Sequence, residues 1–429
     1  ESRGSRLVLR RGPTIKALID LARETGADAV YANKVWEPPL LARDAKAVAA
    51  LRANGLDARL FDDGVLFPPD AMKTTTGGPF RVFAPFLRRC LSSPDPDAPR
   101  PAPARIPSPE TAPPSWPLQE FRLCPSVPWD AGIRAAWPAG EKAGGDRLSG
   151  FLEGALAAYP SDRDRPDRDG TSRLSPYLHF GCISARQVWH AVRSRAGTRR
   201  ATGTVRGAES FLRQLVWREF AHHVLFHFPE TVHAPLREVF TSFPWRDDPA
   251  DLAAWQKGHT GYPLVDAGMR QLWATGWIHN RIRMVVASFL VKDLLLPWRM
   301  GAVWFFDTLV DGDLANNTFG WQWVAGCGAD AAPFFRVFNP VVQGEKFDPG
   351  GDYVRTWVPE LARLPKGWIH RPWDAPATVL SRARVTPGKT YPSPIVDHAA
   401  ARLRAIAALP AGWTLSLRKP VETGDPGER

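Results

Sequence analysis

The pattern of hydrophobic and polar positions changes near residue 92, and the part before it alternates between two periods. Short apolar runs and segments of helical period follow one another as strand, helix, strand, helix and strand over residues 6–10, 13–25, 28–32, 39–54 and 56–67. This alternation is typical of a doubly wound parallel sheet, so residues 1–91 are predicted to form an α/β domain. Such a sheet usually has more strands, and the chain opens at Glu1 without a Met, so we expect the domain to be incomplete at its start.

Proline dominates residues 92–128, where stretches such as SSPDPDAPRPAPARIPSP leave no room for a helix or for the hydrogen-bond ladder of a sheet. We expect a stiff interdomain linker that is held against both domains. Beyond it, apolar residues recur at helical spacing over 147–158, 184–195, 207–227, 263–275, 279–294, 299–310 and 313–325. Residues 129–411 are therefore predicted to form an all-α domain, and residues 412–429 a short flexible tail.

Composition narrows the class of protein. Of the 429 residues, 44% are hydrophobic, which suffices for buried cores. The 4 Cys residues show neither metal-ligand spacing nor a disulfide pattern, so we expect a reducing cytoplasm and no metal site. No apolar run is long enough to span a membrane. The net charge of +11 favours a polyanionic partner, nucleic acid first, and 18 Trp against 6 Tyr favour stacking or redox roles for indoles.

The stretch DGDLANNTFGWQWVAG concentrates carboxylates, amides and indoles on one predicted helix. Upstream, GWIHNRIRMVVASFL places Asn280 and Met284 four residues apart, with Arg283 on a neighbouring line of the helix. That helix would present an amide, a thioether and a guanidinium to one cavity. A buried Arg requires a carboxylate, and the nearest ones without another explanation are Asp311 and Asp313.

The segment GTSRLSPYLHFG precedes a turn and a helix that begins near Pro176. The hydroxyls of Thr171, Ser172 and Ser175, with the free backbone N–H groups of a helix start, suit an anion such as a pyrophosphate. Simple helix capping explains the same residues, so the segment by itself leaves both interpretations open. Tyr159 adds a phenol that could close over the same site.

Five strings carry a family resemblance, in the order WREF, TGYPLVDAGMRQL, WIHNRIRM, DGDLANNTFGWQW and FNPVVQGEKFDPGGDYVRTWVPEL. Behind an α/β domain and a linker, they resemble the photolyase and cryptochrome family of flavoproteins, and class I cyclobutane pyrimidine dimer photolyases in particular. The similarity covers essentially the whole chain. It implies a carbon–carbon lyase that repairs damaged DNA with light and binds FAD.

The resemblance implies a FAD site in the helical domain, with the cofactor bent into a U. The residues around its phosphates would be Tyr159, Thr171, Ser172, Leu174 and Ser175, with Trp217 nearby. The residues around its ring system would be Asn280, Arg283, Asp311, Asp313 and Asn317. Asn317 matches the position that faces flavin N5, and Arg283, paired to Asp311, would stabilise negative charge at the N1 and O2 edge.

The resemblance also implies roles for indoles and cations. Trp321, Trp298 and Trp245 match a chain of tryptophans that carries an electron from the surface to photoexcited oxidised flavin. Trp323 matches the wall on which a flipped-out pyrimidine dimer stacks, and the same hole would be lined by Gln214, Trp217, Asn280 and Met284. The basic residues that would contact DNA phosphates or the lesion are Arg163, Arg281, Arg336 and Lys346.

Repair in this family proceeds by electron transfer from excited reduced flavin to the dimer and back, so it needs neither a nucleophile nor a metal. Related (6-4) photolyases have two histidines where this chain has Asn280 and Met284, which favours cyclobutane dimers as the substrate. Class I enzymes typically have Glu at the position of Gln214. Gln donates and accepts hydrogen bonds but supplies no carboxylate, so this departure bears on efficiency or lesion preference.

Two other functions compete. A cryptochrome-type blue-light photoreceptor would use flavin photoreduction to change a partner interaction, and Asn317, Trp323 and the short tail argue against it. A dark flavin oxidoreductase would need a nicotinamide-binding fingerprint, which the sequence lacks. Pro39 and Leu40 replace the Asn-Glu pair of folate-binding relatives, which disfavours folate at the usual antenna site and leaves a deazaflavin, a second flavin or no antenna chromophore. We expect a monomer without an obligate protein partner.

Overall fold

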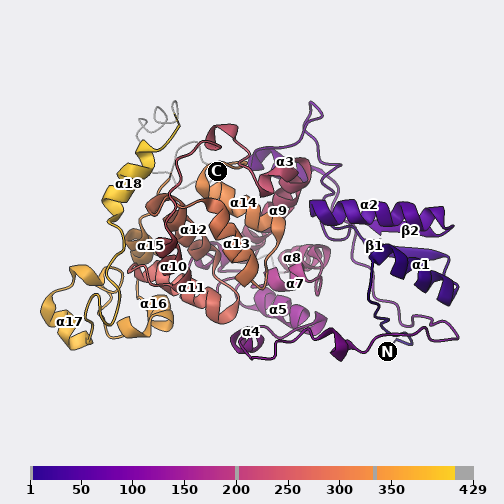
Figure 1. The fold of residues 1–429 in the computed structure, drawn as a ribbon, viewed down its shortest axis with the longest axis horizontal. Coiled ribbons are helices and arrows are strands. Elements are labelled where there is room, and N and C mark those ends of the chain that lie inside the picture. The colour runs from indigo at the N-terminus through magenta and orange to yellow at the C-terminus, as the bar shows by residue number, and fades with distance from the viewer. Residues whose placement is uncertain (1–2, 199–201, 332–335, 411–429) are drawn as a thin grey trace.

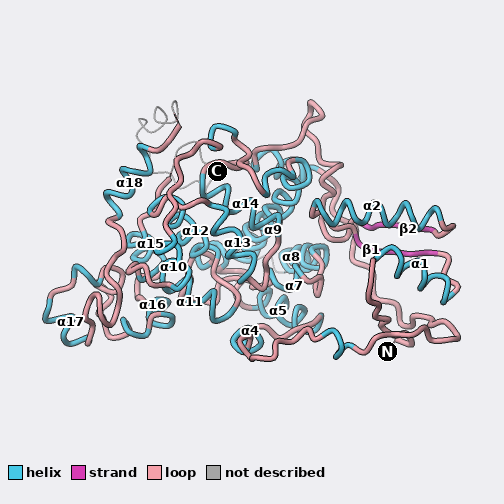
Figure 2. The backbone as a smooth tube through the Cα atoms, viewed as in Figure 1, coloured by secondary structure: helices cyan, strands magenta, loops and turns pink. Residues whose placement is uncertain are grey.

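The computed structural model describes residues 3–198, 202–331 and 336–410. A small α/β part lies at one end of the molecule, and a larger helical body makes up the rest (Figure 1). Among the described residues, strands occur only in the small part, whereas helices and loops build the body (Figure 2). This architecture agrees with the predicted α/β domain followed by an all-α domain.

Two parallel strands form the sheet of the small part. β1 (Ala29–Asn33) pairs with β2 (Asp57–Phe61) from one end to the other, with Ala29 opposite Asp57. α1 (Thr14–Thr25) and α2 (Pro38–Ala53) are its long helices. α2 is the crossover that parallel pairing requires, and Pro38 starts it readily because a first-turn residue needs no N–H donor.

The strand predicted over residues 6–10 is wrong. No described segment pairs with it as a strand. Instead, the Trp116 N–H donates to the Leu9 carbonyl at 3.0 Å, and the Ile106 N–H donates to the Arg3 carbonyl at 2.7 Å. The segment therefore lies beside the linker, which supplies isolated hydrogen bonds rather than a ladder. Alternating apolar residues favour an extended segment, but they do not specify which neighbour satisfies its backbone.

The Pro-rich linker contacts both parts of the molecule. Near its start, Asp95 pairs with Arg193 of α8 (Ala185–Thr198) at 3.0 Å. Farther on, its backbone hydrogen-bonds to residues 3–9 of the small part. The linker is therefore held at both ends, as expected of a stiff spacer. The tail predicted over 412–429 lies outside the described residues.

The remaining helices form the body and its junction with the small part. Their bounds are α3 (Phe83–Ser92), α4 (Ala131–Ala136), α5 (Glu141–Glu153), α6 (Tyr159–Asp162), α7 (Ser175–His179), α9 (Thr202–His227), α10 (Pro249–Lys257), α11 (Pro263–Thr275), α12 (Asn280–Ser288), α13 (Trp298–Thr308), α14 (Leu314–Ala325), α15 (Pro340–Phe347), α16 (Asp352–Trp357), α17 (Ala377–Ala383) and α18 (His398–Ala407). Short 3₁₀ turns are η1 (Leu118–Phe121), η2 (Pro229–Val232), η3 (Glu238–Phe240), η5 (Pro359–Leu361) and η6 (Pro372–Asp374).

The helix predicted over 279–294 is divided in two. α12 continues into a π-helical turn, η4 (Phe289–Asp293), whose residues are all buried. Such turns are rare and often lie near functional sites. The turn brings Lys292 inside the protein, where its ammonium donates to the Arg336 carbonyl, and burial lowers the pKa of Lys292 to about 7.

Two large apolar clusters form the core. One lies under α11 to α14 and contains Trp298 and Trp321. The other joins α3 to α5, α8 and α9 and contains Phe83, Phe86 and Phe220. α9 also meets α14 in a smaller cluster. α9 therefore connects the junction with the small part to the helices that surround the site.

Candidate functional site

A cavity of about 370 Å³ lies among α9, α12, α13 and α14. The polar residues of its lining include those singled out from the sequence as Arg163, Gln214, Asn280, Arg283, Asp311, Asp313 and Asn317. Its apolar wall includes Trp217, Met284, Trp321 and Trp323 from the same set. The fold therefore brings polar and aromatic residues from distant parts of the sequence into one hollow.

Arg283 and Asp311, which both line the cavity, form the expected ion pair. Arg283 Nη2 donates to the two carboxylate oxygens at 2.8 and 3.1 Å, and its Nε donates to the Ile278 carbonyl at 2.8 Å. The Asp311 side chain is only 3% exposed. A carboxylate buried to this degree requires a compensating charge, and the bond to Ile278 fixes the orientation of that charge.

Asp313 caps the start of α14 and also lines the cavity. Its Oδ1 accepts from the Asn316 backbone at 2.7 Å and side-chain amide at 2.6 Å. Burial alone would raise the pKa of Asp313, but His222, Arg218 and the Asn316 bonds outweigh it and hold the pKa below its usual value. Burial lowers the pKa of His222, so Arg218 and Asn316 provide the support that persists at neutral pH.

Asn317 is oriented by two hydrogen bonds. Its backbone N–H donates to the Asp313 carbonyl at 2.9 Å in the first turn of α14. Its side-chain Nδ2 donates to the Ala302 carbonyl of α13 at 2.8 Å. Because the amide nitrogen is held by α13, the plane of the side chain is fixed at the cavity wall.

A second wall combines amides with large apolar groups. Gln214 and Trp217 lie three residues apart on α9, and Asn280 and Met284 lie four apart on α12, so each pair shares one helix face. Trp323 of α14 completes this wall. Such a surface suits a planar heterocycle, because indoles cover its faces and amides reach its edges.

The predicted phosphate-binding residues lie in the segment that leads to α7. Thr171, Ser172 and Ser175 are not on the cavity wall, and Ser172 is held through its carbonyl by Arg147 Nε at 3.0 Å. A Cβ on Gly170 would lie 2.8 Å from the Asp162 carbonyl oxygen, so the segment passes directly against α6. Arg163, the next residue after α6, lines the cavity, and the segment therefore runs beside its edge.

Two predicted residues beside that segment are buried. Leu174 is 1% exposed and Tyr159 is 7% exposed. Burial raises the pKa of Tyr159 to about 12, so its phenol stays protonated and remains a hydrogen-bond donor at neutral pH.

The three predicted electron-transfer indoles differ in exposure. Trp321 lines it, and a Cβ on Gly301 would lie 2.1 Å from the Trp321 ring, so α13 passes directly against this indole. Trp298, the first residue of α13, is also buried. Trp245 is half-buried and packs on the same cluster.

The predicted DNA-binding cations are only partly brought together. Arg281 pairs with Asp164 at 2.9 Å and lies over Phe347, 4.3 Å from the ring centroid. Lys346 Nζ lies 5.2 Å from the same centroid and is exposed. Arg336 is exposed as well. Arg281 is thus held within an ion pair, and the other two residues lie at the surface.

Sequence reasoning missed several residues of the cavity wall: Ala287, Phe305, Leu309, Asn316, Phe319, Gly320 and Val324. Helical spacing from Asn317 and Trp321 was the available signal for Gly320 and Val324. A Cβ on Gly320 would meet nothing within 4 Å, so this glycine widens the cavity rather than relieving a clash. Phe305 carries no comparable signal, because α13 reaches the wall only through tertiary packing.

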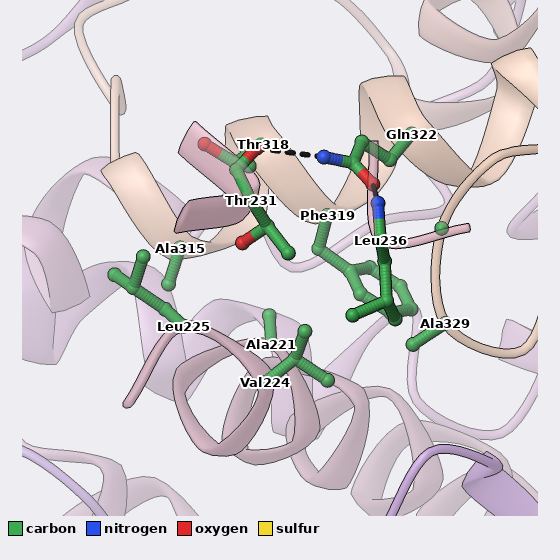
Figure 3. A pocket seen from close by; sticks show the side chains of 11 residues that line it. Ala221, Val224, Leu225, Thr231, Leu236, Ala315, Thr318, Phe319, Gln322 and Ala329 are labelled. Atoms are coloured by element: carbon green, nitrogen blue, oxygen red, sulfur yellow. Dashed lines mark hydrogen bonds between the residues drawn. The ribbon is translucent and has the colours of Figure 1, made fainter. Parts of the chain in front are cut away.

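A smaller pocket of about 10 Å³ lies behind the α14 wall and is too small for a cofactor (Figure 3). Gln322 borders it, with its amide nitrogen donating to the Thr231 carbonyl at 2.6 Å and its oxygen accepting from the Leu236 N–H at 3.0 Å. Gln322 lies between Trp321 and Trp323. It therefore anchors α14 and fixes the helix rotation that directs both indoles.

Pro39 and Leu40, where folate-binding relatives have Asn-Glu, lie in the first turn of α2. No helix in the described part of the chain is long and apolar enough to cross a membrane. Within residues 3–198, 202–331 and 336–410, no three His, Cys, Asp or Glu side chains gather as a metal site would require.

Comparisons with known proteins cover both parts of the chain. Residues 211–411 match the family model described as the FAD binding domain of DNA photolyase, and residues 1–105 match the DNA photolyase model. Deoxyribodipyrimidine photo-lyase of Agrobacterium fabrum is 48% identical over 412 residues, which are 96% of this chain and 85% of that protein. Cryptochrome-1 of Arabidopsis thaliana is 41% identical over 430 residues, or 99% of this chain and 63% of that protein.

Solved structures show the same similarity. A bacterial class III photolyase from Agrobacterium tumefaciens superimposes with a TM-score of 0.91 at 48% identity, over 95% of this chain and 84% of that chain. A Synechocystis cryptochrome superimposes with a TM-score of 0.85 at 31% identity, over 95% of this chain and 84% of that one. Both photolyases and cryptochromes are therefore among the relatives.

Proposed function

The chain belongs to the DNA photolyase and cryptochrome family, and from this premise we propose that it is a FAD-dependent enzyme that repairs cyclobutane pyrimidine dimers in DNA with light. The observation that carries the proposal is the single cavity whose wall combines the Arg283–Asp311 pair with the amide and indole surface of Gln214, Trp217 and Trp323. A charged surface around Arg283 and a surface that combines amides with indoles suit a cofactor and a lesion side by side.

The chemistry of the residues around the Arg283–Asp311 pair fits the ring system of FAD. Arg283 offers a fixed positive charge, and Asn317 offers an amide where a carboxylate would repel negative charge. Asp313 stays ionised and can accept hydrogen bonds from a ligand, and Asn280 lines the same cavity. When bound, the flavin would supply light absorption and the electron that opens the cyclobutane ring.

The cofactor phosphates would lie along the segment before α7. Thr171, Ser172 and Ser175 offer hydroxyls there, and Tyr159 and Leu174 are buried. The protonated phenol of Tyr159 is suited to donate to an anion. The passage of this segment beside the cavity edge supports the assignment.

The second wall would hold the flipped-out dimer. Trp217 and Trp323 would cover its faces, Gln214 and Asn280 would bind its edges, and Met284 would fill the remaining surface. These side chains orient the lesion and exclude water from it. Arg163, Arg281, Arg336 and Lys346 would contact the surrounding phosphates, which predicts sequence-independent and salt-dependent binding.

Trp321, Trp298 and Trp245 would form the route by which an electron reaches the cavity from the surface. Their graded burial supports this role. The sequence motifs favour class I, although a relative at 48% identity is described as class III. Class membership stays a sequence-based prediction.

The test begins with the absorbance spectrum of the purified protein. The protein is then reduced, mixed with an oligonucleotide that carries one thymine dimer, and exposed to blue light while dimers are counted. We expect a flavin spectrum and dimer loss only in the light. The variant Trp323→Ala should keep the flavin spectrum and lose most dimer binding. Flavin that photoreduces while dimers persist would indicate a photoreceptor instead, and absence of flavin would refute the cofactor assignment.

A further inference from the structure

An aromatic contact joins α3, at the junction with the small part of the molecule, to the cavity wall. Phe83, the first residue of α3, stacks face to face on Trp217 of α9, with ring centroids 3.5 Å apart and planes inclined by 8°. The two residues are far apart in the sequence. Phe83 is 1% exposed, whereas Trp217 lines the cavity. One face of the Trp217 indole is therefore covered by a side chain that is not itself on the cavity wall.

Two neighbouring aromatic rings also contact Trp217. Phe220 meets it edge to face at 6.0 Å, and Phe319 lies at 5.8 Å with the planes inclined by 46°. Rotation of the indole about its side-chain bonds would require Phe83 to move. The stack therefore fixes the plane that Trp217 presents.

Phe83 is itself held in place from another part of the chain. Its backbone N–H donates to Asp330 Oδ1 at 3.1 Å, and the Asp330 N–H donates to the Arg81 carbonyl at 3.0 Å. Asp330 lies in the segment after α14. These bonds fix the start of α3 against the helical body, so the position of the Phe83 ring does not depend on its stacking alone.

We propose that Phe83 is a positioning residue for lesion recognition, which acts by holding the indole of Trp217 flat against a bound dimer. This inference rests on the proposed function. An indole that is already fixed loses no rotational freedom when it binds, whereas a mobile one does, and the difference corresponds to about a three- to tenfold change in affinity. α3, at the junction with the small part, thus contributes to dimer affinity without lining the cavity.

The test compares Phe83→Leu with the matched control Phe86→Leu. Phe86 belongs to the same helix, is fully buried, and meets Phe80, Phe220 and His223. Affinity is measured for a dimer-containing and an undamaged oligonucleotide, together with FAD content and thermal unfolding. We expect Phe83→Leu to weaken dimer binding about three- to tenfold, with FAD content and affinity for undamaged DNA unchanged. Phe86→Leu should lower thermal stability only.

Equal loss of dimer preference in both variants, or no loss in Phe83→Leu, would overturn the proposal. If Phe83→Leu does not fold, Asp330→Ala, which removes the backbone bond and keeps the ring, should reduce dimer preference in the same direction; an unchanged preference would again overturn the proposal. Wild-type protein that does not distinguish the two oligonucleotides would instead refute the proposed function, and the inference with it.

Discussion

A single nitrogen of Arg283, Nη2, contacts both carboxylate oxygens of Asp311 at 2.8 and 3.1 Å. Replacing the carboxylate by an amide keeps the shape but leaves the guanidinium without its counter-charge. We expect Asp311→Asn to lower the free energy of unfolding by about 2 kcal/mol and to weaken FAD retention. Chemical denaturation and flavin absorbance after gel filtration would measure both effects.

The control for this variant is Asp146→Asn, which breaks an exposed pair with Lys142. Exposed pairs contribute little, so its stability should match that of the wild type. Equal destabilisation by both substitutions would show that the Arg283–Asp311 pair has no special role.

Asn317→Asp should destabilise reduced flavin. Aspartate cannot donate to the Ala302 carbonyl as Asn317 does at 2.8 Å, and it adds a negative charge to the cavity wall. The added repulsion is on the order of 2 kcal/mol. Stopped-flow absorbance should show faster reoxidation in air than in wild type or in Asn316→Ala, a change on the same wall that adds no charge. Unchanged reoxidation would remove Asn317 from its assigned position.

Trp298→Phe should slow photoreduction of oxidised flavin while sparing repair by chemically prereduced protein. Phenylalanine keeps the packing but is much harder to oxidise, and we expect a loss of about tenfold, or about 1.4 kcal/mol in the barrier. Trp189→Phe, a buried indole of the other core cluster, serves as the control. Flash photolysis measures the first reaction and dimer counting the second. Equal losses in both reactions would assign Trp298 a structural role only.

Stability should decrease on acidification because of His279. Burial lowers the pKa of this imidazole from 6.5 to about 4, and its Nδ1 accepts from the Arg281 N–H at the start of α12. Between these two values the unfolded chain binds more protons, so the stability present above pH 6.5 is lost as the pH falls towards 4. The contribution is about 3 kcal/mol.

His279→Asn should reduce this pH dependence, because asparagine caps a helix and does not titrate. Urea unfolding at several pH values measures the effect, and the exposed residue His259 provides the control His259→Asn. A pH profile that is the same in wild type and His279→Asn would contradict the assignment.

Lys346→Gln should weaken DNA binding equally for damaged and undamaged oligonucleotides. Loss of one phosphate contact should also reduce the slope of log K against log salt concentration by about 0.9. The exposed residue Lys142 provides the control Lys142→Gln. Fluorescence anisotropy across a salt series measures the slope. A selective loss of dimer affinity would instead indicate that Lys346 contacts the lesion.

Local sequence patterns were enough to predict most helices around the cavity and the chemical character of its residues. The helical period of apolar residues can be recognised within a short window of sequence, so α11 (Pro263–Thr275) was predicted with its observed bounds. Helical spacing also predicted that Asn280, Arg283 and Met284 face one cavity, because residues three or four apart on a helix share a face wherever that helix packs. The role of Asn317 came from the family resemblance alone. The extended segment over 6–10 shows the limit of this reasoning, since strand pairing depends on a distant partner.

Which helix faces meet, and what lies behind the cavity wall, could be seen only in the folded structure. The stack of Phe83 on Trp217, the ion pair of Arg281 with Asp164 and the approach of Gly301 to Trp321 all join residues without a fixed spacing. Such contacts depend on how whole surfaces fit together, and no local period encodes that fit. Short-range spacing therefore specifies what each helix offers, and long-range packing specifies what it contacts.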